Sequence, residues 1–136
     1  MNAGADRRGP GKAMERRLYL LRHAKSSWDD AARDDHDRDL TGRGRQAAER
    51  MGLLCATDGI APALVVCSTA RRARETLARL VPHLAGTGRI EFEEGLYLAG
   101  AAELLRRVRR IEDAVASAML IGHNPGLQEL AVLLCA

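Results

Sequence analysis

Aromatic side chains are scarce in this sequence. Phe, Trp and Tyr make up 3% of its 136 residues, with one Trp and one Phe. Leu, Ala and Val must therefore supply most of the hydrophobic core, and the stacking platforms that hold single-stranded nucleic acid are missing. The net charge of +3 is compatible with nucleic-acid binding, but no nucleic-acid motif accompanies it, so we expect no nucleic-acid partner.

Cysteines and long apolar runs are also few. The three cysteines lie far apart and form no C-x-x-C pair, namely Cys55, Cys67 and Cys135. This spacing argues against a disulfide framework or a zinc site and favours a reducing compartment. No apolar run approaches the roughly 20 residues of a membrane span, and the N-terminal stretch lacks the hydrophobic centre of a signal peptide. We therefore expect a cytoplasmic protein without a membrane partner.

The length of the chain predicts one domain. Residues 1–15 are small, charged and rich in Gly, so we expect a disordered tail before a domain over residues 16–136. Strands are predicted at 17–22, 63–67, 89–92 and 118–122. Helices are predicted at 41–58, 69–84 and 101–113, and a last helix opens at Pro125. This alternation predicts an α/β fold with a mostly parallel sheet covered by helices on both faces. The chain ends within the last helix, so its C-terminal end is expected to be truncated.

Hydrophobic spacing predicts which face each helix buries. The first helix is expected to begin at the N-cap Thr41 and to carry five residues inward: Ala47, Ala48, Met51, Leu54 and Cys55. The third helix carries a cluster of arginines opposite its apolar face, namely Arg106, Arg107, Arg109 and Arg110. We interpret this cluster as a solvated face, with a docking surface for an acidic partner as the alternative.

Polar residues that suit phosphate chemistry follow three of the predicted strands. The first strand ends in Arg22-His23, the second in Cys67-Ser68 with Arg72 close behind, and the fourth in Gly122-His123. Because the carboxyl ends of parallel strands share one edge of a sheet, these groups are expected to converge. Guanidinium groups neutralise phosphoryl oxygens, and an unprotonated imidazole is available as a nucleophile near neutral pH. Such chemistry requires no metal and no cofactor.

Three motifs in this order resemble those of the histidine phosphatase superfamily, which is also called phosphoglycerate mutase-like. They are RHA at 22–24, S-x-A-x-R-A-x-E-T at 68–76 and GHNPG at 122–126. The stretches LYLLRHAKSSW and GHNPGLQEL are most similar to the small SixA-type phosphohistidine phosphatase branch. The resemblance covers about residues 17–134 and implies a three-layer α/β sandwich.

The resemblance also implies roles for four residues. His23 is the nucleophile that becomes phosphorylated, Arg22 and Arg72 bind the phosphoryl oxygens, and His123 completes the phosphate-binding pocket. Arg71 occupies a variable position and is expected to point elsewhere. Thr69 and Asp39 stand where the family usually has proline, which affects only local rigidity.

A general acid is not assigned by the sequence. Asn124 stands where one branch of the superfamily has a carboxylate, and Leu98 falls where a Leu-x-Glu pattern would place the acid. Glu93 and Glu94 are nearby alternatives. The long loop adds several acidic residues, most of which are interpreted as solvating: Asp29, Asp30, Asp34, Asp35 and Asp37. The other two histidines, His36 and His83, are expected at the surface.

The leading functional prediction is a metal-independent phosphatase that forms a phosphohistidine intermediate. Imidazole leaves a phosphoramidate more easily than an alkoxide leaves an ester, so a missing acid favours phosphohistidine in a protein as the substrate. Alternatives are a phosphatase for small-molecule phosphate monoesters and a non-catalytic phosphate-binding or docking module. A phosphoglycerate mutase is disfavoured because the chain lacks inserts for a cap. The expected partner is thus a phosphorylated protein or a small phosphorylated substrate, and the oligomeric state is left open.

Overall fold

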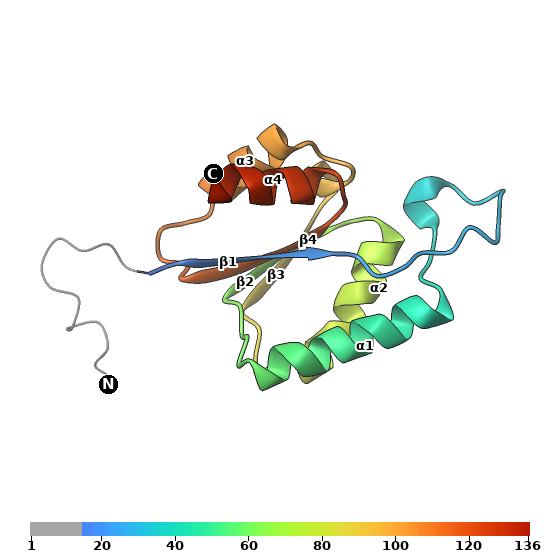
Figure 1. Ribbon diagram of the computed structural model, residues 1–136, viewed down its shortest axis with the longest axis horizontal. Coiled ribbons are helices and arrows are strands. Elements are labelled where there is room, and N and C mark those ends of the chain that lie inside the picture. The colour runs from blue at the N-terminus through green and yellow to red at the C-terminus, as the bar shows by residue number, and fades with distance from the viewer. Residues whose placement is uncertain (1–14) are drawn as a thin grey trace, which may run out of the picture.

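A computed structural model describes residues 15–136 of the chain (Figure 1). The predicted disordered tail lies outside the described residues, apart from Glu15. No helix within 15–136 is long and apolar enough to cross a membrane. The domain boundary at residue 16 stays a prediction.

Four parallel strands form the central sheet in the order β1-β4-β2-β3. They are β1 (Arg17–Arg22), β2 (Leu64–Ser68), β3 (Arg89–Glu93) and β4 (Ser117–Gly122). In register, Leu20 of β1 lies beside Leu120 of β4, which lies beside Val66 of β2. All of β2 is buried, as is β4 after its first residue, because each is paired on both sides and covered on both faces. The parallel sheet is confirmed, with strand bounds shifted by one residue at β2, β3 and β4.

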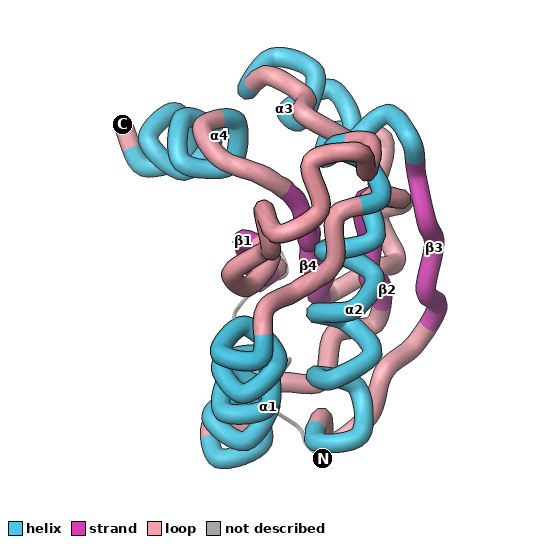
Figure 2. Tube along the Cα trace, turned by 90° about the vertical axis from the view of Figure 1, so that its right-hand side faces the viewer, coloured by secondary structure: helices cyan, strands magenta, loops and turns pink. Residues whose placement is uncertain are grey.

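Helices cover both faces of this sheet, as Figures 1 and 2 show. The helices α3 (Ala101–Arg109) and α4 (Gly126–Cys135) lie on one face, and α1 (Gly42–Thr57) and α2 (Arg71–Leu80) lie on the other. Alternate residues of β2 serve the two resulting cores: Val66 packs with Leu120 and Leu127, and Val65 packs with Leu77 and Ile121. The predicted three-layer α/β sandwich is therefore confirmed.

The buried face of α1 differs from the prediction. Thr41 caps the helix as expected, because its hydroxyl accepts the Gly44 N–H at 2.9 Å. However, Met51 is 37% exposed and Leu54 is 54% exposed, whereas the inward residues are small: Gly44, Ala48, Gly52 and Cys55. A Cβ on Gly44 would lie 2.2 Å from the carbonyl oxygen of Lys25. The helix thus packs by close approach of its backbone, which a count of large apolar residues does not reveal.

The other helices also differ at their ends. The helix α2 begins at Arg71, two residues after the predicted start, and α3 ends at Arg109. Pro125 precedes the first residue of α4 as its N-cap. The arginine cluster is partly a solvated face, but Arg107 is an exception with a side chain only 11% exposed. Its guanidinium binds Glu93 and Glu91 of β3, so it joins α3 to the sheet.

Candidate active site

His23 follows the last residue of β1, and its backbone N–H continues the ladder to the carbonyl of Gly122. Its ring Nδ1 lies 2.7 Å from the carbonyl oxygen of Ala24. Because a carbonyl only accepts hydrogen bonds, Nδ1 carries the proton and Nε2 carries a lone pair. Arg72 Nε donates to His23 Nε2 at 3.3 Å, which also requires an unprotonated Nε2. The hydrogen-bond partners therefore assign the tautomer in which Nε2 is nucleophilic.

Arg72 lies in the first turn of α2, and its side chain is only 3% exposed. Besides His23, its guanidinium binds one residue twice: Nη1 donates to the carbonyl of Asp35 at 2.6 Å, and Nη2 donates to the Asp35 carboxylate at 3.1 Å. A buried guanidinium with a fixed orientation is suited to planar, paired recognition of anionic oxygens.

His123 follows β4 and is 3% exposed, with its ring centre 5.1 Å from that of His23. Its Nε2 lies 2.8 Å from the hydroxyl of Ser68, which accepts the Ala70 N–H at 3.2 Å. The Ser68 hydroxyl can at the same time donate its proton to His123 Nε2, and in that tautomer the His123 proton lies on Nδ1. That Nδ1 is buried and has no hydrogen-bond partner among residues 15–136. A buried N–H donor without a partner is well placed to bind an anionic oxygen.

Both histidines are held in the neutral form. Burial lowers the pKa of His23, and the charges of Arg72, Arg22 and Arg38 lower it further, against the opposing bond to Ala24. Burial, followed by the charge of Arg72, lowers the pKa of His123 to about 3. Near neutral pH the site therefore combines an unprotonated nucleophile with a neutral donor and buried positive charge.

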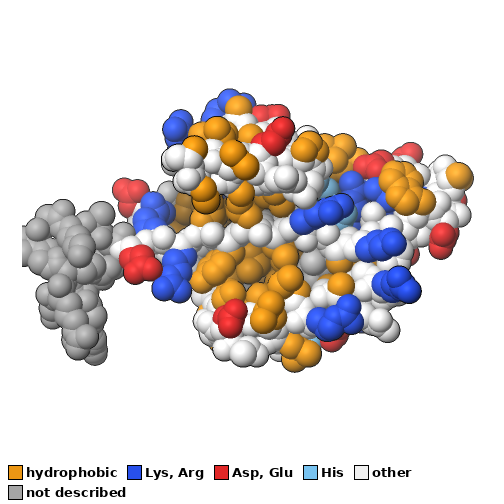
Figure 3. Space-filling model, viewed as in Figure 1, with side chains coloured by type: hydrophobic (Ala, Val, Ile, Leu, Met, Phe, Trp, Pro, Cys, Tyr) orange, Lys and Arg blue, Asp and Glu red, His pale blue; other side chains and the backbone are white. Residues whose placement is uncertain are grey.

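Arg22 lies at the rim, apart from buried Arg72 and His123 and from partly buried His23. Its side chain is exposed, and it lines a cavity of about 410 Å³ with His23, Lys25, Ser26 and Trp28. Lys and Arg side chains gather near the visible histidine at the right of the face in Figure 3. The structure thus brings His23, Arg72 and His123 together at one edge of the sheet and places Arg22 at the entrance.

Asp35 and Tyr97 belong to the site, although the sequence did not indicate them. The Tyr97 hydroxyl donates to the Asp35 carboxylate, which also accepts from Arg38 and Arg72. These bonds, with that of Tyr97 the strongest, lower the pKa of Asp35 to about 2. Asp35 is thus not one of the solvating residues of the loop, because it orients Arg72. Tyr97 comes shortly after β3, so the strand-end rule applied to that strand would have indicated it.

The expectation that His36 lies on the surface is wrong, because the residue is partly buried. Its Nε2 lies 2.9 Å from the Thr69 hydroxyl, and its ring meets that of Tyr97 edge-on with centres 4.7 Å apart. His83 is partly buried as well, since it packs against Gly52 and its Nε2 lies 3.1 Å from Glu49. Ser68 was noted only as part of a motif, and its contact with His123 depends on the pairing of β2 with β4.

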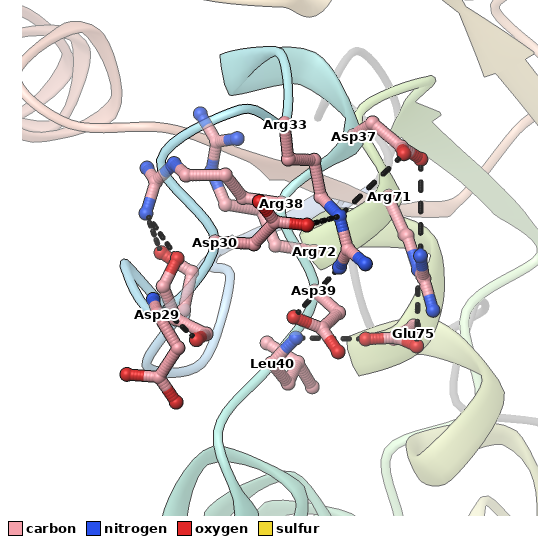
Figure 4. A network of polar contacts seen from close by, with 12 residues as sticks. Asp29, Asp30, Arg33, Asp37, Arg38, Asp39, Leu40, Arg71, Arg72 and Glu75 are labelled. Carbon is pink, nitrogen blue, oxygen red and sulfur yellow. Dashed lines mark hydrogen bonds and ion pairs between the residues drawn. The ribbon is translucent and has the colours of Figure 1, made fainter.

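Ion pairs hold the loop that carries Asp35 (Figure 4). Arg33 contacts Asp30, Asp37 and Asp39. Arg71 pairs with Glu75 and Asp37, which confirms that it points away from His23. Glu75 in turn accepts the Leu40 N–H at 2.8 Å, so α2 fixes the end of the loop.

Neither Asp35 nor Glu93 is arranged to donate a proton. Asp35 is ionised near neutral pH because of its low pKa. Glu93 binds Arg107 through both carboxylate oxygens, at 2.8 and 2.9 Å. Among residues 15–136, no group of three or more His, Cys, Asp and Glu side chains could hold a metal ion.

The fold and the site together define an α/β protein with a cluster of histidine and arginine side chains at the carboxyl edge of its sheet. Residues 18–97 match the family model "Histidine phosphatase superfamily (branch 1)". The chain belongs to this superfamily. The matched range includes Arg22, His23 and Arg72 and ends before His123.

Known proteins support this assignment. An uncharacterised chloroplast protein of Arabidopsis thaliana is 34% identical over 92% of this chain and 62% of its own length. An uncharacterised protein of Mycobacterium tuberculosis is 35% identical over 85% of this chain and 70% of its own. The structure is similar to that of SixA from Agrobacterium tumefaciens, a candidate phosphohistidine phosphatase. That similarity has a TM-score of 0.79 and 32% identity over 85% of this chain and 74% of the other. Of the Arabidopsis relative's own length, the chain spans less than two thirds.

Proposed function

We propose that this chain is a phosphatase that transfers a phosphoryl group to His23 and then to water. One observation carries the proposal: the lone pair of His23 Nε2 faces the Arg72 guanidinium, beside the unpartnered Nδ1–H of buried His123. A nucleophile, a fixed cation and a neutral donor within one pocket are what phosphoryl transfer needs, since it depends on positioning and charge neutralisation.

The proposed reaction has two steps. In the first, His23 Nε2 attacks phosphorus, the bond from phosphorus to the leaving group breaks, and the leaving group retains that electron pair. In the second, water attacks phosphorus, and the bond to Nε2 breaks with its electron pair returning to Nε2. One proton of the attacking water passes to bulk water, and inorganic phosphate leaves. Arg72 and His123 bind the phosphoryl oxygens throughout, and Arg22 contributes charge from the rim.

We further propose phosphohistidine in a protein as the preferred substrate. The ionised Asp35 and the ion-paired Glu93 favour a leaving group that needs little help from an enzyme acid. Imidazole meets this condition, because its second ring nitrogen takes a proton from water before the bond to phosphorus breaks. The similarity to the SixA protein of Agrobacterium tumefaciens supports the same substrate class.

The experiment exposes the protein briefly to a phosphohistidine-containing protein, quenches it under alkaline conditions and locates the phosphate by mass spectrometry. Phosphate is expected on His23, and His23→Ala is expected to abolish both the label and phosphate release. The control is His83→Ala, because His83 packs beside Gly52 and contacts none of the proposed catalytic residues.

Substrate preference is measured in parallel with an alkyl phosphate monoester at the same pH and enzyme concentration. A kcat/KM for the alkyl ester that equals or exceeds that for phosphohistidine would refute the proposed substrate and favour small monoesters. The cavity of about 410 Å³ beside His23 is within the size range of small-molecule pockets and supports that alternative. Partner binding by His23→Ala without any turnover by the wild type would instead indicate a docking module.

A further inference from the structure

The chain has one tryptophan, Trp28, and it is among the most exposed large hydrophobic residues described. It is 75% exposed and lines the cavity of about 410 Å³ that also contacts His23. Exposing a large aromatic ring to water is unfavourable, and Trp side chains are enriched at binding surfaces. The proposed chemistry at His23 gives this ring no role.

One face of the indole is held in place from below. The Arg38 guanidinium carbon lies 3.5 Å from the centre of the ring, in the geometry of a cation–π contact. Arg38 is itself buried and fixed, since it donates to the Asp35 carboxylate at 3.0 Å and to the Ser26 hydroxyl at 2.8 Å. The ring therefore rests on a rigid support and not on a mobile side chain.

The backbone that carries Trp28 is also fixed. The Ser27 N–H donates to the carbonyl of Asp39 at 2.7 Å, and the Asp29 N–H donates to the Ser27 hydroxyl at 3.0 Å. Ser26 forms a β-bridge with Leu40. A platform held in this way loses little conformational entropy when a ligand stacks on it.

Arg38 covers one face of the Trp28 indole at 3.5 Å. Because Trp28 is 75% exposed, its exposed area includes the opposite face of the ring. The other cavity walls are Arg22, Lys25 and Ser26, which are cationic or hydroxylic. Such a cavity suits a planar group attached to an anion, with the ring on Trp28 and the anion towards Arg22 and His23.

We propose that Trp28, Lys25 and Ser26 form a subsite for a planar leaving group, and that the imidazole of phosphohistidine stacks on Trp28. The proposal rests on the proposed function for its choice of ligand. It adds a basis for selecting planar leaving groups over alkyl groups, which the phosphoryl pocket alone does not supply.

The test compares two substrates that share a P–N bond and differ in the ring: phosphohistidine and phosphoramidate. The variant Trp28→Ala is expected to lower kcat/KM for phosphohistidine about tenfold, which corresponds to the loss of one aromatic stacking contact. For phosphoramidate it is expected to change kcat/KM less than about twofold, because that substrate has no ring to stack. The variant Trp28→Phe retains a plane and should stay within about threefold of wild type for both substrates.

A matched control is Phe92→Ala, which removes an exposed aromatic residue from β3, at the opposite edge of the sheet from β1. It is expected to leave both rates unchanged. Equal losses for both substrates with Trp28→Ala would mean that Trp28 only supports the loop through Arg38, and would overturn the subsite. Unchanged rates for both would overturn it as well.

Two further measurements separate this proposal from the proposed function. The ratio of para-nitrophenyl phosphate to ethyl phosphate turnover is expected to fall with Trp28→Ala, even if phosphohistidine is not a substrate. In His23→Ala, the fluorescence of the single tryptophan should change on addition of phosphohistidine and not of phosphoramidate. If Trp28 favours the aryl substrate but phosphohistidine is not turned over, phosphohistidine is refuted as the substrate and the subsite at Trp28 stands. In a chain without any turnover, the fluorescence response alone decides, and its absence overturns the subsite.

Discussion

The two halves of the site differ in their exposure to water. Ser68 ends the central strand β2, His123 follows the central strand β4, and Arg72 lies in the helix after β2; all three are buried. Arg22, Lys25 and Trp28 follow or end the strand β1 and are exposed. Among the described residues, β1 pairs with β4 alone, whereas β2 and β4 each pair on both sides. The position of a strand in the sheet thus decides how much protein surrounds the residues at its end.

This difference suggests a division of labour within the proposed enzyme. The buried half has fixed orientations and low dielectric, which strengthen its interaction with a phosphoryl group of constant shape. The exposed half has room for the group that carries the phosphoryl and varies between substrates. His23 lies between the two halves and is partly buried.

The largest expected effect contrasts the two arginines. Arg72→Ala is expected to lower kcat/KM about 10³-fold, because it removes a buried, oriented cation. Arg22→Ala is expected to lower it about 30-fold, because water screens an exposed charge. Steady-state kinetics measures both, and Arg71→Ala is the neighbouring control, expected to stay within about twofold. If Arg22→Ala and Arg72→Ala lowered kcat/KM equally, the predicted difference between the exposed and the buried half of the site would be wrong.

The next effect concerns Ser68. Ser68→Ala removes the hydroxyl that holds the His123 tautomer, so the Nδ1–H donor is no longer assured, and kcat/KM is expected to fall about 30-fold. Ser68→Thr retains a hydroxyl and should recover most of the activity. The control is Ser117→Ala at the other end of β4, whose hydroxyl also accepts a backbone N–H, from Ala63 at 3.1 Å. ¹⁵N NMR of His123 reports the tautomer directly, and an unchanged tautomer in Ser68→Ala would contradict this role.

The next prediction compares how the buried His123 and the partly buried His23 affect the free energy of unfolding at acid pH. An unfolded histidine binds a proton near pH 6.5, whereas His123 in the fold does so at about 3. Between these values the unfolded state holds more protons, so the free energy of unfolding decreases as the pH falls. His123→Gln is expected to reduce this slope by up to about 1.4 kcal/mol per pH unit between pH 5.5 and 4. Urea denaturation at several pH values measures it.

His23→Gln provides the comparison for this measurement. The pKa of His23 is lowered in the same direction, but His23 is only partly buried. The reduction in slope is therefore expected to be smaller, and to begin as the pH falls below about 6.5. If His23→Gln reduced the pH dependence of the free energy of unfolding as much as His123→Gln, the two side chains would be equally shielded from water.

The smallest effect concerns Tyr97. Tyr97→Phe keeps the ring contacts with His36 and His123 but removes the bond to Asp35. The pKa of Asp35 is then expected to rise from about 2, and kcat/KM to fall about threefold, since Asp35 keeps its bonds to Arg38 and Arg72. Titration of the Asp35 carboxyl by NMR provides the first measurement. A loss of kcat/KM greater than about 30-fold would place Tyr97 in the chemistry itself.

The parallel sheet and the convergence of His23, Arg72 and His123 were predictable from sequence, because strand-end position follows from local hydrophobic runs and a general rule of sheet topology. The contact between Asp35 and Tyr97 was not, since the two residues meet from 62 residues apart. Tyr97 at least follows a strand end, whereas nothing local marks Asp35. The buried face of α1 was mispredicted for a different reason. Gly44 and Gly52 are buried because they are small, and hydrophobic periodicity gives weight only to large side chains.

The contacts of Arg72 have a consequence for turnover. Its guanidinium already binds His23 Nε2 and both the carbonyl and the carboxylate of Asp35. Binding of a phosphoryl oxygen therefore exchanges one set of hydrogen bonds for another, and the net free energy of capture is only their difference. The same difference applies in reverse when inorganic phosphate dissociates, because the protein regains its own contacts. A site arranged in this way favours rapid release of product over tight retention of the anion.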